Sequence, residues 1–187
     1  MKAMQKRLYF VGIFVLSLWL VFIVDCIVPQ DIHEWGIIPR TIGGLVGIPL
    51  SPFLHASLTH LLGNTISLAI LLSLLVGTRS RPWLVVGAIA LLGGALLWLM
   101  GTSNNHIGAS GIAFGLIAYM LVTGFVERKP KSIAIALAVA FFFGGTLISG
   151  VIPKLGSNVS WDGHLFGAIA GAGVAYFLHE KNKRMSW

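Results

Sequence analysis

The sequence contains a succession of apolar runs, each close to 20 residues long, separated by short segments that carry charges, Gly or Pro. A helix needs about 20 apolar residues to cross a hydrocarbon core about 30 Å thick. In lipid every backbone N–H and C=O must be paired within the protein, so runs this long and apolar are predicted to be helices rather than barrel strands. The expected fold is an all-α membrane protein, a six-helix bundle forming one domain over residues 1–187. Its spans are 8–28, 58–76, 83–100, 107–126, 133–150 and 163–178.

The distribution of charge predicts how the bundle is oriented. Only 10% of the residues are charged, whereas a soluble domain is about one-quarter charged. The net charge of +7 would suit a nucleic-acid partner, but eleven of the thirteen basic residues fall on the side of the two termini if the spans alternate. The positive-inside rule then places both termini in the cytoplasm. We expect a multi-pass protein of a bilayer, of bacterial inner-membrane type, without a nucleic-acid partner. The eleven are Lys2, Lys6, Arg7, Arg79, Arg81, Arg128, Lys129, Lys131, Lys181, Lys183 and Arg184, and the other two are Arg40 and Lys154.

Four polar side chains on three expected helices fall at a common depth. Ser110 and His164 lie 17 and 16 residues before the acidic residue that ends their spans, or about 25 and 24 Å at 1.5 Å per residue. His60 and Asn64 lie 19 and 15 residues before the first arginine after theirs, or about 28 and 22 Å. These three spans run in the same direction, so we expect one polar layer just below the outer surface.

Each of these residues also has a simpler explanation. Ser110 lies in a Gly-rich segment, and Gly111 and Gly115 have the spacing used for close helix packing. His60 and Asn64 are four residues apart, so they share a helix face and could form hydrogen bonds between helices. His164 by itself could line a proton or ion path.

Taken together, the four residues match one chemistry. Serine is a weak nucleophile until a base removes its proton, and histidine is the usual base because its pKa lies near neutrality. The backbone N–H of Ser110, the ring of His60 and the amide of Asn64 could stabilise an oxyanion. The sequence therefore predicts a Ser–His dyad without a metal or cofactor.

Two neighbouring polar residues are expected to have other roles. Asp162 lies only two residues from His164, so the two side chains should point apart on a helix, and Asp162 is expected to cap the sixth helix. His106 lies in an outer loop and is expected to be solvated or interfacial. It is four residues from Ser110 and is the fallback base if His164 proves remote.

Three motifs occur in order: "HASLTHLLGN" on the second span, "GASG" opening the fourth and "GHLFGAIAG" on the sixth. With these motifs the chain resembles the rhomboid family of intramembrane serine proteases, whose substrates are transmembrane proteins. The resemblance implies Ser110 as nucleophile, His164 as general base, and His60 and Asn64 as oxyanion donors. It implies a structural role for His55 in the first loop. The other supporting positions are Gly108 and Gly111 around the serine, Phe114 where relatives often stack a tyrosine on the histidine, and Gly167 and Gly171 for close helix approach.

Two alternatives remain open from the sequence. The first is a catalytically inactive rhomboid-like protein that binds membrane clients, although such proteins typically lose the serine or the histidine. The second is a small transporter or channel with the polar layer as its permeation site. That architecture predicts discontinuous or charged helices near the midplane, which the sequence does not show. The natural substrate, the oligomeric state and the gating element are left undetermined.

Overall fold

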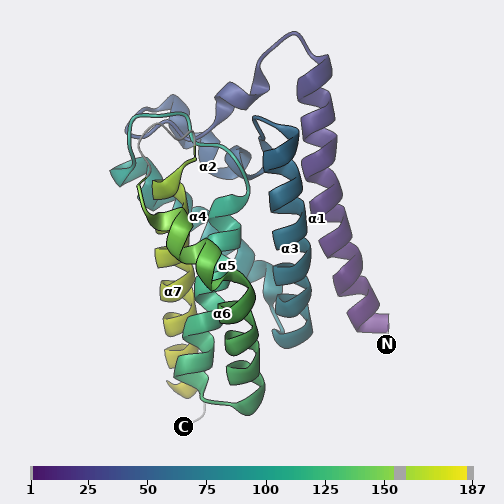
Figure 1. Ribbon diagram of the computed structural model, residues 1–187, viewed down its shortest axis with the longest axis vertical. Helices are drawn as coiled ribbons and strands as arrows, with labels where there is room; N and C mark the ends of the chain where they lie inside the picture. Colours follow the sequence, from purple (N-terminus) through teal and green to yellow (C-terminus); the bar gives the residue numbers. More distant parts are fainter. Residues whose placement is uncertain (1, 154–158, 185–187) are drawn as a thin grey trace.

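The computed structural model describes the backbone of residues 2–153 and 159–184 and the side chains of residues 3–153 and 159–180 (Figure 1). Lys154 and the side chains of Lys2, Lys181, Lys183 and Arg184, all used in the charge prediction, lie outside the described part. Within that part the chain is helical and forms no strand, apart from an isolated bridge between Ile37 and His106. The long helices are α1 (Lys2–Ile27), α3 (Leu58–Thr78), α4 (Pro82–Met100), α5 (Ser110–Glu127), α6 (Pro130–Val151) and α7 (Trp161–Arg184).

In the described residues, five helices are long and apolar enough to cross a membrane: α1 from Ala3, α3, α4, α5 and α6. Helix α7 has 24 residues but is not among them. Its apolar residues are interrupted by Asp162, His164 and several glycines. The prediction of an all-α membrane bundle is confirmed, whereas a membrane-crossing α7 stays a prediction.

Helix α5 forms the centre of the bundle. It contacts α3, α4, α6 and α7, and 61% of its apolar window is buried, against 11% for α1 and 6% for α6. Figure 1 shows α1 beside α3 at one edge of the molecule. The outward faces of α1 and α6 carry large exposed apolar side chains such as Leu16 and Phe141, as expected where helices face lipid tails.

The long connection after α1 folds over one end of the bundle. It contains η1 (Ile32–Trp35), η2 (Gly43–Leu45), α2 (Gly47–Leu50) and η3 (Ser51–Phe53), with an apolar helical stretch over Gly43–Phe53. Ile37 exchanges two backbone hydrogen bonds with His106, and the Gly108 N–H donates to the Ser51 carbonyl at 2.8 Å. The connection is thereby fastened to the loop that leads into α5.

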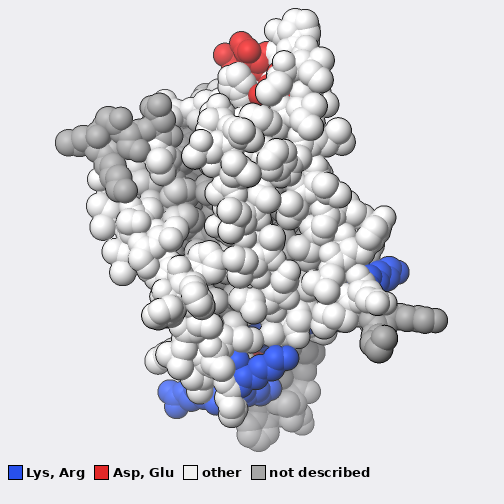
Figure 2. Space-filling model, turned by 45° about the vertical axis from the view of Figure 1, so that its right-hand side comes forward, with Lys and Arg blue, Asp and Glu red and all other residues white. Residues whose placement is uncertain are grey.

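Basic side chains gather at the opposite end of the bundle, where both termini lie in Figure 1; Figure 2 shows Lys and Arg there, with acidic side chains at the far end. Arg79, just after α3, forms a two-pronged ion pair with Glu127 at the end of α5. Arg7 of α1 donates to the carbonyls of Val76 and Arg79 at 3.1 and 3.0 Å. These contacts tie three helix ends together.

The start of α5 differs from the sequence prediction. The expected span begins at residue 107, whereas the helix begins at Ser110. Gly108 has a φ of +110°, a conformation that glycine adopts readily and that a right-handed helix cannot contain. The chain therefore turns at Gly108, and Ser110 becomes the first residue of the central helix.

Candidate active site

Ser110 and His164 are in direct contact. The Oγ atom of Ser110 lies 2.9 Å from Nε2 of His164, although the residues are 54 positions apart in the sequence. Ser110 is the first residue of α5 and His164 lies in the first turn of α7. Because α5 and α7 pack against each other and start at the same end of the bundle (Figure 1), their first turns meet.

The close approach of α7 to α5 depends on glycine. A Cβ atom at Gly167 would overlap the carbonyl of Gly111, and one at Gly171 would overlap the carbonyl of Gly115. The two backbones touch because no side chain separates them, as in other close helix pairs within membranes. This proximity brings the His164 ring within reach of the serine.

The second ring nitrogen of His164 fixes its tautomer. Nδ1 lies 3.0 Å from the carbonyl oxygen of Gly150. A carbonyl only accepts hydrogen bonds, so Nδ1 carries the proton and the Nε2 lone pair faces the Ser110 hydroxyl. Gly150 lies in the last turn of α6, where carbonyls have no partner within the helix. The Phe114 ring stacks on the imidazole, with centroids 3.9 Å apart and planes 6° apart.

His60 and Asn64 lie on the same cavity as the pair. This open cavity of about 720 Å³, termed here the main cavity, is lined by residues of α3, α5, α6 and α7, among them His60, Asn64, Ser110, Phe114 and His164. The structure thus brings all four residues of the predicted polar layer around one space. The His60 ring also lies against Gly108, where a Cβ atom would come within 2.5 Å of its Cε1 atom. A side chain at position 108 would displace it.

His55 lies behind the cavity and orients Asn64. Its Nδ1 is 3.3 Å from the Phe53 carbonyl and its Nε2 is 3.0 Å from Nδ2 of Asn64. The carbonyl requires a proton on Nδ1, so Nε2 accepts from one amide N–H of Asn64. Burial, and to a smaller extent the neighbouring His60, lowers the pKa of His55 to about 4. The ring is therefore neutral, and it fixes which end of the Asn64 amide carries the N–H groups.

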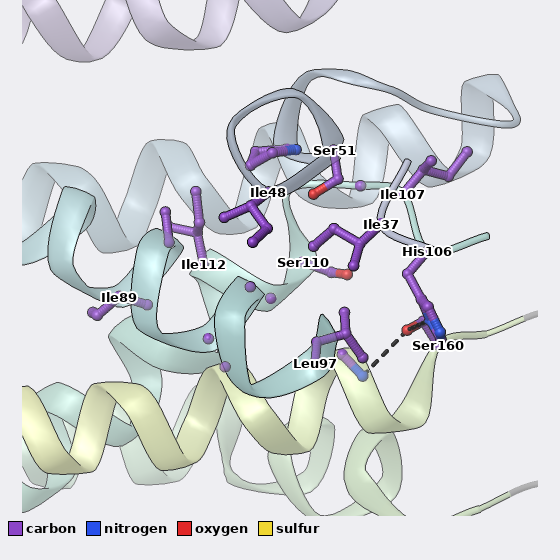
Figure 3. Close-up of a pocket in the computed structure, with 18 residues that line it drawn as sticks. Ile37, Ile48, Ser51, Ile89, Leu97, His106, Ile107, Ser110, Ile112 and Ser160 are labelled. Carbon is purple, nitrogen blue, oxygen red and sulfur yellow. Dashed lines mark hydrogen bonds between the residues drawn. The ribbon is translucent and has the colours of Figure 1, made fainter. Parts of the chain in front are cut away.

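Ser110 also borders a second, smaller cavity of about 50 Å³, shown in Figure 3. Ser51, His106 and Ser160 contribute polar atoms to its wall, and the remaining lining is largely apolar, with Ile37, Ile48 and Leu97. Its volume and polar groups suit a few water molecules. Ser110 therefore lies between a large open space and a small polar one.

The expectation that His106 is solvated was wrong. Its side chain is only 4% exposed; Nε2 lies 2.8 Å from the Thr102 carbonyl and Nδ1 lies 2.7 Å from Oγ of Ser160. Both ring nitrogens are thus directed away from Ser110, so the structure does not support His106 as an alternative base. Its backbone bridge to Ile37 and its ring contacts fold the loop before α5 against the start of α7.

The expected cap of the sixth helix is also different. Ser160, the residue before α7, accepts the Gly163 N–H through its Oγ at 3.2 Å, the geometry of an N-cap. Asp162 instead accepts from the backbone N–H and the hydroxyl of Thr102, both at 2.8 Å. Asp162 therefore joins the loop before α5 to the helix that carries His164. Sequence spacing alone gave no sign of this link.

Among the described residues, no group of three or more His, Cys, Asp or Glu side chains is placed to hold a metal ion. The fold and the contact together define a class: a helical, multi-pass membrane protein that holds a serine and a histidine in hydrogen-bond contact at one end of its bundle.

Comparison with known proteins identifies the family. The Rhomboid domain model matches residues 40–181. The chain is 40% identical over 181 residues to the uncharacterized protein Rv1337 of Mycobacterium tuberculosis (strain ATCC 25618 / H37Rv) and to the uncharacterized protein Mb1372 of Mycobacterium bovis, covering 91% of this chain and 75% of each relative. The uncharacterized protein ML1171 of Mycobacterium leprae is 38% identical over 91% of this chain and 71% of its own length. The chain belongs to the rhomboid family. The names of these three relatives state no activity, so the comparisons support the family and not a particular reaction.

Proposed function

We propose that this protein is an intramembrane serine protease that uses Ser110 and His164 as a catalytic dyad. The observation that carries this proposal is the 2.9 Å contact between Ser110 Oγ and His164 Nε2, together with the Gly150 carbonyl that keeps the proton on the other ring nitrogen. Membership of the rhomboid family supports the same conclusion.

In the proposed reaction, Ser110 Oγ attacks the carbonyl carbon of a substrate peptide bond while His164 Nε2 accepts the hydroxyl proton. The tetrahedral intermediate collapses as Nε2 returns that proton to the leaving amine, which leaves an ester on Ser110. Water then attacks the ester and gives a proton to Nε2, which protonates Ser110 Oγ as the acid product leaves. The transient imidazolium is stabilised by the Gly150 carbonyl and by the face of the Phe114 ring.

The negative charge of the intermediate falls on the carbonyl oxygen, and three groups at the main cavity are suited to stabilise it. The backbone N–H of Ser110 lies at the start of α5, where helix N–H groups have no intrahelical partner and the dipole favours negative charge. Asn64 uses one amide N–H on His55 and retains a second. His60 contributes its ring to the same cavity.

The proposed partners are transmembrane proteins within the bilayer. The main cavity is lined from α3 and α6, with hydroxyls such as Ser67, Thr146 and Ser149, which suits an unwound peptide whose backbone needs hydrogen-bond partners. We place both termini in the cytoplasm of a bacterial inner membrane, because basic residues gather at the end where the termini lie (Figure 2). Reporters fused to each terminus test this orientation, and a periplasmic signal from either would contradict it.

A serine-directed fluorophosphonate tests the function directly. The purified full chain should be labelled at Ser110, and Ser110→Ala should abolish the label. Ser149→Ala is the matched control, because Ser149 lines the same cavity but its hydroxyl is bound to the Thr146 carbonyl. Absence of labelling in a folded wild-type protein, or labelling that persists in Ser110→Ala, would contradict the proposal and favour an inactive client-binding protein.

A further inference from the structure

A third cavity lies at the opposite end of the bundle from Ser110. It has a volume of about 180 Å³ and lies between the ends of α3 and α5 and the start of α6. We call it the basic pocket. Its lining combines four charged side chains with four hydroxyls: Arg79, Glu127, Lys129 and Lys131, and Thr78, Tyr119, Thr123 and Ser132.

The charges of the basic pocket do not cancel. Arg79 donates to both carboxylate oxygens of Glu127, at 2.5 and 3.2 Å, and the Ser132 hydroxyl donates to the same carboxylate at 2.5 Å. Glu127 is therefore already neutralised and hydrogen-bonded. Lys129 and Lys131 have no carboxylate partner within the described part of the chain, so the pocket carries a net charge of +2.

Hydrogen-bond donors are also in excess. A guanidinium has five N–H donors, of which Arg79 uses two on Glu127, while the Tyr119 ring holds the group in place at 5.6 Å. Lys131 makes one long bond of 3.3 Å to the Gly77 carbonyl, and Lys129 makes none to the described side chains or backbone. Such a surplus of positive donors is suited to a compact anion with several acceptor oxygens.

The position of the pocket indicates where such an anion would come from. Helix α3 ends at Thr78, α5 ends at Glu127 and α6 begins at Pro130, so the pocket lies where apolar spans stop and phospholipid headgroups begin. The pocket is also smaller than the roughly 300 Å³ of an ordinary small-molecule site. We propose that the basic pocket binds a phosphate group, that of an anionic phospholipid or of a soluble phosphate compound, held by Arg79, Lys129 and Lys131.

Thermal unfolding of the purified full chain tests this site independently of proteolysis. The chain is titrated in a neutral detergent with phosphatidylglycerol, with phosphatidylcholine of the same acyl chains, or with inorganic phosphate against chloride at equal ionic strength. The test variant is Lys129→Gln/Lys131→Gln, which spares the Arg79–Glu127 pair. The control is Lys6→Gln/Arg81→Gln, which removes two exposed basic side chains at the same end of the bundle that do not line the pocket.

Phosphatidylglycerol should raise the Tm of the wild type and of the control, whereas phosphatidylcholine should not. The test variant should need at least roughly tenfold more of the anionic lipid for the same shift, because each lost charge-assisted hydrogen bond costs about 1.5 kcal/mol or more. If inorganic phosphate gives the same shift and competes with the lipid, the site is confirmed and its source is soluble. Equal behaviour of the two double variants, or no response to either phosphate source, would overturn the proposal.

Discussion

The carbonyl oxygen of Gly150 lies 3.0 Å from Nδ1 of His164 and occupies the place that a carboxylate has in a Ser-His-Asp triad. It holds the ring in the tautomer whose Nε2 lone pair faces Ser110. Because it is uncharged, it orients the ring without the ionic stabilisation of the imidazolium that an aspartate would add. In this site the backbone at the end of α6 supplies the third member.

Gly150→Ala should therefore lower activity. Its methyl group would overlap the Phe114 ring and lie 3.2 Å from Nδ1 of His164, so the stacked rings must shift. A displacement of about 1 Å at a reacting group can cost about 10²-fold in rate, and we expect a loss of about 10- to 100-fold in kcat and in the rate of phosphonate labelling. Gly145→Ala on the same helix, where a Cβ atom meets nothing within 4 Å, should keep near-normal rates. Equal rates in the two variants would show that position 150 is unimportant.

Removal of either dyad residue should abolish cleavage of a transmembrane test substrate. We expect Ser110→Ala and His164→Ala each to lower kcat by roughly 10⁴-fold or more, because residues that act as one unit fail together. The double variant should be no worse than either single one. Gel-based cleavage in liposomes measures the rate, and circular dichroism checks that the variants remain folded. Near-normal activity in either folded single variant would rule out the dyad.

Loss of an oxyanion donor should have a smaller effect. Asn64→Ala and His60→Ala should each reduce kcat on the order of 10²–10³-fold, while Ser110 still reacts with the phosphonate, because nucleophile and base remain. The ratio of cleavage to labelling rates measures this difference. If kcat is unchanged in both variants, His60 and Asn64 serve helix packing instead.

The sequence predicted the elements whose chemistry resides in side chains. Ser110, His164, His60 and Asn64 could be placed in one layer because the rise of a helix is constant, so charges at the helix ends fix depth. Gly150 could not be predicted, because any residue would supply the same carbonyl and only the docking of α6 on α7 selects it. The burial of His106 was likewise hidden, since it depends on the Ser160 hydroxyl 54 positions away.

The boundaries of the elements show a similar division. The turn at Gly108 moves the start of α5 to Ser110, and its positive φ was not evident from an apolar run that continues through Ile107. Asp162 was assigned to a cap from local spacing, but its partner is Thr102 in a distant loop. Local patterns thus predicted helices and motifs, and tertiary contacts decided how polar groups between them are paired.

The stability of the protein should fall in acid because of His55. Its folded-state pKa of about 4 lies below the ordinary value of 6.5, so between these pH values the unfolded chain binds the proton and the folded chain does not. His55 therefore contributes its full stability above pH 6.5, and this is lost as the pH falls towards 4, by up to about 3 kcal/mol. Unfolding in detergent at several pH values measures this slope. His55→Gln cannot titrate, so its Tm should fall less steeply over this range; parallel curves for the two proteins would contradict the assignment.

The form of the substrate follows from the position of Ser110 at the start of α5. A helical substrate keeps its carbonyls in hydrogen bonds and covers them with side chains, so its bond must unwind before Ser110 Oγ can attack. Unwinding in hydrocarbon would leave backbone groups unpaired at several kcal/mol each. The main cavity, with its hydroxyl groups and the exposed loop from Thr102 to Asn105 above it, could pair these groups and admit the water that hydrolyses the ester.

We therefore predict cleavage near the external end of substrate helices, favoured by Gly or Pro close to the scissile bond; the rhomboid resemblance adds a small residue before it. The test moves a Gly-Pro pair along one transmembrane substrate, maps each cut by mass spectrometry and compares the rates with an all-Leu helix. The rate should be highest when the pair lies at the depth of Ser110, about 25 Å from the cytoplasmic helix ends, and lowest for all-Leu, because an intact helix resists unwinding there. Equal rates for the all-Leu helix, or cuts near the cytoplasmic end, would show that unwinding at this depth does not control cleavage.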